Sequence, residues 1–304
     1  MFYSLNQKTM QNLENQLKTL VRETYSQVAE QSLAQNASSC CGATGSCGGV
    51  ETAIMAEDYS QLAGYVPQAD LGLGCGLPTQ FAKIKTGDTV IDLGSGAGND
   101  CFIARAETGP TGKVIGIDFT EKMIQKARYN AETLGFNNVE FRFGDIEDMP
   151  VRDNVADVVV SNCVLNLVPN KANVFKEIYR VLKPEGHFSI SDIVLVGELP
   201  HELIKQAELY AGCVSGAIQQ DEYLKLINEA GFTNLTLQKA RVIQLPDEIL
   251  LNYLSPEALV AFKASGVGIV SVTVYAEKPA DKPKVKLSEL GEVSVCCTPG
   301  SSCC

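Results

Sequence analysis

Residues 89–99 read TVIDLGSGAGN, and this stretch decides the fold. The first five residues form a short apolar run typical of a buried strand, and glycines follow at positions 94, 96 and 98. Glycine lets a ligand lie close against the backbone at the carboxyl end of a strand, and a helical pattern comes next. The stretch therefore predicts a strand, a ligand-binding loop and a helix, the opening unit of a doubly wound α/β sheet.

Four further strand-like runs follow, with helical patterns at residues 121–136 and 170–186 between them. Pro184 and Gly186 stop the second helical pattern. Buried strands that alternate with helices imply a mostly parallel sheet covered on both faces. The four runs are Lys113–Ile117, Val139–Phe143, Val155–Ser161 and His187–Asp192.

The pattern changes after Val196 to helices through about Gly231, then to strand-like stretches at Thr233–Gln244 and Val270–Glu277. We interpret this part as a smaller α+β insertion beside the sheet, followed by late edge strands. The expected segments are 1–60, 61–196, 197–277 and 278–304.

Both ends of the chain differ from this core. Leu13 to Val28 shows the spacing of an amphipathic helix that packs over the main domain. Residues 36–50 are small and rich in Gly and Ser, and the part from Lys278 onwards has a composition unable to form a core, so both are expected to be flexible. The first flexible segment holds Cys40, Cys41 and Cys47, and the second holds two CC doublets, at 296–297 and 303–304.

Charge and cysteine content narrow the function classes. The formal charge of −11 disfavours nucleic acid as a partner. The sequence has neither a cationic leader before an apolar run nor about 18 consecutive apolar residues, which predicts a cytoplasmic protein without a membrane partner. Eleven cysteines, an odd number, indicate thiols kept reduced for chemistry. Nothing in the patterning requires more than a monomer.

The glycine loop and the acidic residues after the strands predict a cofactor site. The third glycine comes one residue earlier than in the dinucleotide motif, and Asp118 ends the second strand, where a carboxylate can accept both ribose hydroxyls. Asp145 or the Ile146 amide is placed to meet an adenine edge. The alternatives are a nicotinamide or flavin site, a ligand-free turn, and loop or N-cap roles for the acids. The predicted cofactor-binding residues are Asp92, Gly94, Ser95, Gly96, Gly98, Asp118, Phe119, Asp145, Ile146 and Asn162.

Three cysteines occupy positions from which the fold could bring them together over the glycine loop. Cys163 follows the fourth strand, Cys75 lies in a glycine-flanked turn before the sheet, and Cys213 lies in the helical insertion. Cys101 is interpreted as a small buried apolar side chain. A zinc site is disfavoured because the chain has no CxxC pair and only two histidines, His187 and His201.

The segments DLGSGAGND, GIDFTEKMIQKAR, GDIEDMP and YRVLKPEGHFSISD resemble the successive signatures of the class I S-adenosylmethionine-dependent methyltransferases, which have a Rossmann-like fold. The GCG turn, SNCVLNLVP, AGCVSGA and the CC doublets resemble the arsenite methyltransferases in particular. This resemblance implies S-adenosylmethionine as methyl donor, arsenite and methylarsenite as substrates, and glutathione or thioredoxin as reductant.

The same resemblance implies roles for individual cysteines. Cys163 and Cys213 would hold As(III), and Cys75 would be either the third thiolate or the redox partner of Cys40 or Cys41. Members of this family often have an aromatic residue near the GCG turn, where this chain has Leu73-Gly74. Tyr59 and Tyr65 are the candidates to replace it.

A mechanism follows from these roles. Three thiolates leave the lone pair of As(III) exposed toward the methyl donor, so no proton need be removed and orientation carries the reaction. Two other hypotheses stay open: a methyltransferase for a carbon or oxygen acceptor such as a quinone precursor or sterol, and a non-catalytic metalloid-binding protein. The tail cysteines either relay arsenic or have no catalytic duty.

Overall fold

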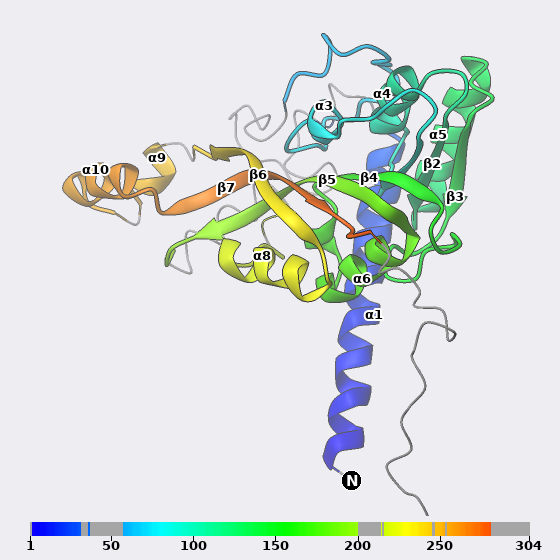
Figure 1. The fold of residues 1–304 in the computed structure, drawn as a ribbon. Coiled ribbons are helices and arrows are strands. Elements are labelled where there is room, and N and C mark those ends of the chain that lie inside the picture. The colour runs from blue at the N-terminus through cyan, green and yellow to red at the C-terminus, as the bar shows by residue number, and fades with distance from the viewer. Residues whose placement is uncertain are drawn as a thin grey trace, which may run out of the picture.

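The structure is a computed structural model that describes residues 2–31, 36, 57–199, 214, 216–244, 247–252 and 254–280. Its centre is a seven-stranded sheet with the strand order β3-β2-β1-β4-β5-β7-β6 (Figure 1). The first five strands are parallel, and β7 is antiparallel to both of its neighbours. The strands are β1 (Thr89–Leu93), β2 (Lys113–Asp118), β3 (Val139–Phe143), β4 (Ala156–Asn162), β5 (Leu182–Val196), β6 (Thr233–Val242) and β7 (Gly268–Glu277).

The sequence predicted the first four strands to within one residue at each end, and β5 runs longer than the predicted His187–Asp192. It begins at Leu182, directly after helix α6, and it continues to Val196 because β7 pairs with it from His187 to Val196. The partner strand that causes this extension lies about 80 residues away in the chain, where the local pattern gives no sign of it.

The prediction that both late strands lie at the edge is wrong for β7. Strand β6 forms the edge, whereas β7 lies between β5 and β6. Every residue of β7 from Gly268 to Ala276 is buried, and most residues of β6 are exposed or half-buried. Strand β7 is paired on both sides and buried along its length, so it belongs to the same core as the parallel strands.

Helices cover both faces of the sheet (Figure 1). On one face Phe175 of α6 and Tyr223 of α8 pack into a core with the strands, and on the other face Phe102 of α4 and Met123 of α5 do so. The doubly wound α/β architecture is confirmed. The helices are α1 (Phe2–Ala29), α3 (Pro78–Phe81), α4 (Asn99–Thr108), α5 (Glu121–Thr133), α6 (Lys171–Val181), α8 (Gln220–Glu229), α9 (Asp247–Leu250) and α10 (Pro256–Ser265), with a 3₁₀ turn η2 (Leu165–Leu167).

Helix α1 is present as the sequence predicted and packs beside α5, but only part of its predicted apolar face is covered: Val21 is buried, whereas Leu17 and Leu20 are exposed. Its last turn joins the core, with Val28 fully buried, and Lys126 of α5 donates a hydrogen bond of 2.9 Å to the Ala29 carbonyl oxygen. No described helix is long and apolar enough to cross a membrane. The division of the chain into four segments stays a prediction.

Candidate active site

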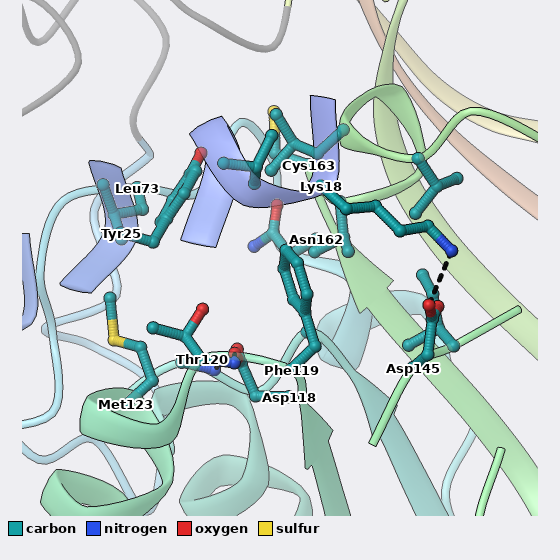
Figure 2. A pocket seen from close by; sticks show the side chains of 17 residues that line it. Lys18, Tyr25, Leu73, Asp118, Phe119, Thr120, Met123, Asp145, Asn162 and Cys163 are labelled. Atoms are coloured by element: carbon teal, nitrogen blue, oxygen red, sulfur yellow. Dashed lines mark hydrogen bonds and ion pairs between the residues drawn. The ribbon is translucent and has the colours of Figure 1, made fainter. Parts of the chain in front are cut away.

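A pocket lies at the carboxyl ends of β2 and β4, where doubly wound sheets bind ligands (Figure 2). Its volume is about 710 Å³, which includes space that is open to solvent. We call it the first pocket. Its walls come from the glycine loop after β1, the ends of β2 and β4, and helix α1. The predicted cofactor residues among its lining are Gly94, Gly96, Asp118, Phe119, Asp145, Ile146 and Asn162, and Cys163 also lines it.

The glycine loop leaves backbone open to the pocket. Gly94 has φ +66° and lies so close to Val164 that a Cβ atom would come within 2.4 Å of Val164 Cγ2. Gly96 has φ +51°, and a Cβ atom there would meet nothing within 4 Å. Both conformations favour glycine, and the space at Gly96 fits a flat nucleoside lying against the main chain.

The carboxylate of Asp118 holds this loop to the end of β2. Its Oδ2 accepts a hydrogen bond of 3.0 Å from the Gly96 amide, and its Oδ1 accepts one of 2.7 Å from the Thr120 amide. Burial raises the pKa of Asp118, against these hydrogen bonds, which lower it. Asp118 is therefore fixed at the wall of the first pocket, and its role as a ribose ligand stays a prediction.

Helix α1 forms one wall of the first pocket (Figure 2), a contact that no local sequence pattern predicts. Lys18, Val21 and Tyr25 line it, and the Lys18 ammonium lies 2.6 Å from Asp145 Oδ2 and also pairs with Glu147. The carboxylate of Asp145 is thus held by Lys18. The other predicted adenine contact, the amide of Ile146, belongs to the next residue of the same loop.

A second pocket of about 490 Å³ adjoins the first, and the two share Leu73, Gly94, Gly96 and Asn162. Its further lining includes the predicted residues Asp92 and Ser95. Leu73, which stands where members of the family often have an aromatic residue, therefore lines both pockets. The other residues of this lining are Tyr59, Ala69, Asp70, Leu71, Gly74, Ala97, Asn99 and Asp100.

Asp92, at the floor of the second pocket, is tied to Cys101. Its Oδ2 accepts a hydrogen bond of 3.2 Å from the Cys101 thiol. Burial, and after it the neighbouring Asp100, raises the pKa of Asp92 well above its usual range. Cys101 is buried as predicted, and in addition it donates to a residue of the glycine motif.

Asn162 connects the two pockets to the turn that carries Cys75. Its Oδ1 accepts hydrogen bonds from the amides of Cys75 at 3.0 Å and Gly76 at 3.3 Å. Its Nδ2 donates to the Gly76 carbonyl oxygen at 2.8 Å, to Asp100 Oδ2 at 3.2 Å and to the Tyr59 hydroxyl. One side chain at the end of β4 thus fixes the GCG turn.

Cys75 and Cys163 belong to one buried apolar cluster, although they lie 88 positions apart in the sequence. We call it the thiol cluster. Their exposed fractions are 0% and 4%. Cys163 has φ +61°, a conformation that costs a non-glycine residue about 1–3 kcal/mol and that clusters at functional sites. The other buried members are Ile193, Leu195, Val214, Ile243 and Ile269.

Several predicted cysteines lie outside the described residues: Cys40, Cys41, Cys47, Cys213 and the four of the tail. Val214, which follows Cys213 directly, is buried in the thiol cluster. Gly98 is not part of either pocket lining; it is the N-cap of α4, with φ +100°. Within the described part of the chain, no group of three or more His, Cys, Asp and Glu is placed to hold a metal ion.

Tyr59 and Tyr65, the two candidates to replace the missing aromatic residue, differ in place. Tyr59 is buried and lines the second pocket, where its hydroxyl lies 3.1 Å from Asp100 Oδ2 and 3.0 Å from the Gly76 carbonyl oxygen. Tyr65 donates instead to Asp70 at 3.0 Å and lines neither pocket. Tyr59 and Asp100 are site residues whose pairing no local sequence signal could have shown.

Sheet order, glycine loop and acidic strand ends together define a class I S-adenosylmethionine-dependent methyltransferase, and residues 84–231 match the family model of a methyltransferase domain. An arsenite methyltransferase of Halobacterium salinarum is 39% identical over 275 residues, which cover 86% of this chain and 67% of that protein. The chain belongs to the arsenite methyltransferase family.

Two further similarities agree with this assignment. The human arsenite methyltransferase is 38% identical over 170 residues, which cover 53% of this chain and 45% of that protein. The crystal structure of an arsenic (III) S-adenosylmethionine methyltransferase from Chlamydomonas reinhardtii has a TM-score of 0.56 at 32% identity and covers 69% of this chain and 68% of that one. The chain thus spans about two thirds of the length of the Halobacterium salinarum relative and less than half of the length of the human one.

Proposed function

We propose that this chain transfers a methyl group from S-adenosylmethionine to trivalent arsenic held by cysteine thiolates, with arsenite and methylarsenite as substrates. The observation that carries the proposal is the place of Cys163. This residue lines the first pocket and also packs with Cys75 in the thiol cluster. Thiolates prefer soft ions, and a pair of thiols beside a methyl-donor pocket suits a soft acceptor better than a carbon or oxygen acceptor.

Cys213 is the second arsenic ligand that we propose beside Cys163, and its neighbour Val214 is buried in the thiol cluster. Cys75 serves either as the third thiolate or as the redox partner of Cys40 or Cys41. In the first role, three thiolates bind As(III) in a pyramid and leave its lone pair as the nucleophile.

S-adenosylmethionine, when bound, supplies an electrophilic methyl group. The described residues then bind and orient: Asp118 and the glycine loop hold the donor, and Asn162 fixes the turn of Cys75. The lone pair of arsenic forms the new bond, so the protein needs no general base. The apolar side chains of the thiol cluster keep water away from the reacting atoms.

The electron balance of the reaction requires a reductant. Methyl transfer to the lone pair takes arsenic from the trivalent to the pentavalent state, and two thiols that become a disulfide return the two electrons. We propose Cys40 or Cys41 with Cys75 for this step, and glutathione or thioredoxin to reduce the disulfide afterwards.

The decisive experiment is an incubation of the purified chain with arsenite, S-adenosylmethionine and glutathione, with methylated arsenic followed by chromatography and elemental detection. Cys163→Ser and Cys213→Ser should abolish the methylated product. Cys101→Ala removes a buried thiol that lies outside the thiol cluster, so arsenite binding, measured separately by equilibrium dialysis, should be unchanged in this control.

Two outcomes would contradict the proposal. If the wild-type chain binds the donor but yields no methylated arsenic, the acceptor is to be sought among carbon and oxygen compounds such as quinone precursors and sterols. If it binds arsenite but no donor, it is a metalloid-binding protein without this activity.

A further inference from the structure

A further pocket, which we call the third pocket, lies where strands β6 and β7 meet helices α9 and α10. Its volume is about 610 Å³, which includes space that is open to solvent. Leu250 of α9 and Phe262 of α10 line it together with Val242 of β6 and Gly268 of β7. Figure 1 shows α9 and α10 beyond one end of the sheet, on the side away from β2 and β3. No described residue lines both the first pocket and the third.

The third pocket borders the thiol cluster. Ile243 and Ile269 line the pocket and are also buried members of that cluster, and Leu199 lines the pocket and packs against the cluster. The Ile243 amide donates a hydrogen bond of 2.8 Å to the Ile269 carbonyl oxygen, so the two residues are neighbours on adjoining segments. Two aliphatic side chains therefore form the boundary between the third pocket and the cluster that contains Cys75 and Cys163.

The buried thiols need an approach that the donor does not occupy. Cys163 lines the first pocket, where the proposed donor binds, so a bound donor covers this thiol from that side. An acceptor that arrives after the donor must reach the thiols by another way, and so must a product that leaves before S-adenosylhomocysteine does. The third pocket touches the same cluster through different residues, Ile243 and Ile269.

The chemistry of the third pocket suits a small neutral molecule. Most of its lining is aliphatic or aromatic, and Lys263 is the one charged residue among the described lining residues. The ammonium group of Lys263 lies 2.5 Å from Asp247 Oδ1, so its charge is already paired. Trivalent arsenic in neutral water is uncharged arsenous acid, and each methylation replaces a hydroxyl group with an apolar methyl group. Such molecules enter an apolar space at little cost, whereas a sulfonium cation does not.

The walls of the third pocket also lie mostly outside the part of the chain that resembles methyltransferase domains in general. The matching family model covers residues 84–231, and Leu199 is the one lining residue within it. The glycine loop and Asp118 fall inside that range, whereas α9 and α10 are inserted between β6 and β7, beyond it. This position favours a role toward the acceptor over a role toward the donor.

We propose that the third pocket is the route by which neutral trivalent arsenicals reach the thiol cluster and by which the methylated product leaves, while the first pocket holds the donor. The inference rests on the proposed function, which supplies the acceptor. Passage requires Ile243 or Ile269 to change its side-chain rotamer. A route differs from a holding site because an obstacle in it slows entry and exit alike and leaves the affinity unchanged.

Gly268→Leu is the variant that obstructs the route. The φ of Gly268 lies outside the left-handed region, and a Cβ atom there would have its nearest contact at 3.6 Å, with Val242 Cγ1, so the backbone accepts a side chain. Association of arsenite with the chain saturated with S-adenosylhomocysteine is followed by stopped-flow absorbance of the As–S bonds. The part of the signal that is missing in Cys163→Ser reports the thiol cluster. Dissociation is followed after addition of excess small dithiol, which traps the released arsenic.

Both rates should fall at least about tenfold in Gly268→Leu, because a packed side chain must now be displaced during passage. The Kd for arsenite should stay within about threefold, a difference of less than 1 kcal/mol. Val260→Leu is the control, because Val260 lies on α10 with an exposed fraction of 69% and does not line the pocket. Wild-type rates in Gly268→Leu, a loss of affinity without slower association, or equal slowing in both variants would each overturn the proposal.

A measurement on the wild-type chain tests the route even if Gly268→Leu does not fold. Saturation with S-adenosylhomocysteine should leave the association rate of arsenite within about twofold, whereas entry through the first pocket would be slowed strongly and would refute the route. The two proposals fail differently. If the wild type methylates arsenite and one of the contrary rates is found, the route alone is wrong. If arsenite binds but no methylated arsenic forms, the proposed function is wrong and the rates still test the route. A wild-type chain that binds no arsenite at Cys163 contradicts both.

Discussion

Replacing Asn162 with alanine should loosen the turn of Cys75 and leave the sheet in place. The substitution removes the acceptor of the Cys75 and Gly76 amides and the donor to the Gly76 carbonyl oxygen. A buried backbone group without a partner costs about 1–3 kcal/mol. The low end applies here because Asn162 lines both pockets, so water can enter.

The Gly76 carbonyl oxygen keeps the Tyr59 hydroxyl as a partner, so two backbone groups, the amides of Cys75 and Gly76, lose theirs. At about 1 kcal/mol each they predict a loss of about 2 kcal/mol in the free energy of unfolding. At about 2–4 °C per kcal/mol for a chain of this size class, the melting temperature should fall by about 4–8 °C. Because the thiol of Cys75 is then no longer held, the affinity for arsenite should fall at least about tenfold, which equals 1.4 kcal/mol.

Asn166→Ala provides the matched control. Asn166 is buried and donates one hydrogen bond of 2.6 Å to the Ile193 carbonyl oxygen, but it makes no hydrogen bond to the turn of Cys75. It should lower the melting temperature and keep the arsenite affinity within about threefold. Thermal unfolding and equilibrium dialysis with arsenite measure the two quantities. If Asn162→Ala melts and binds arsenite like the wild type, or if both variants lose arsenite equally, the reasoning is refuted.

Three other variants test further parts of the structure. Gly94→Ala should lower donor affinity at least about tenfold, because its Cβ would lie 2.4 Å from Val164 Cγ2. The control is Gly135→Ala, because Gly135 has a similar φ of +67° and open space around it. Calorimetry should find donor binding nearly unchanged in this control. Lys18→Met should weaken donor binding but change the free energy of unfolding by less than about 1 kcal/mol, since the ion pair is partly exposed; an equal donor Kd in both proteins would speak against α1 as a pocket wall. Burial raises the pKa of Asp192 to about 7, so between about pH 4 and 7 the unfolded state binds fewer protons than the folded state. The free energy of unfolding of the wild type therefore falls as the pH rises, by up to about 1.4 kcal/mol per pH unit. Asp192→Asn lacks this slope, so its free energy of unfolding should rise relative to that of the wild type as the pH increases through that window. Denaturant unfolding measures this difference between the two proteins, and an equal difference at pH 5 and pH 7.5 would contradict the prediction.

The parallel half of the fold could be predicted because its signals are local. Strands β1, β2 and β4 are short runs that are mostly buried, and each ends at a loop, so composition alone marks their bounds. The place of β7 between β5 and β6 could not be predicted in this way, because pairing joins strands that are far apart in sequence. A periodic pattern shows which residues are buried, and it does not show which strand lies beside them.

The candidate site divides in the same manner. The glycine loop and Asp118 follow directly from strand ends and were predicted by position. Tyr59 and Asp100 are in contact although they lie 41 positions apart in the sequence, and Lys18 contacts Asp145 at a separation of 127 positions. No sequence motif joins the members of either pair, so neither contact could be predicted. The sequence of helix α1 shows an apolar face, but the same pattern is expected whether that face covers a core or forms the wall of a pocket.

Asn162 and Cys163 connect the donor site and the thiol cluster, because they are consecutive residues at the end of β4. Asn162 lines both pockets and holds the turn of Cys75, whereas Cys163 lines the first pocket and packs with Cys75. Asp118 lines only the first pocket, whereas Ser271 lines neither pocket and donates a hydrogen bond of 2.6 Å to the Cys75 carbonyl oxygen. Substitutions at Asp118 or Ser271 should therefore separate donor binding from arsenite binding. A substitution at Asn162 should disturb both, because its hydrogen bonds fix the thiol turn relative to the donor.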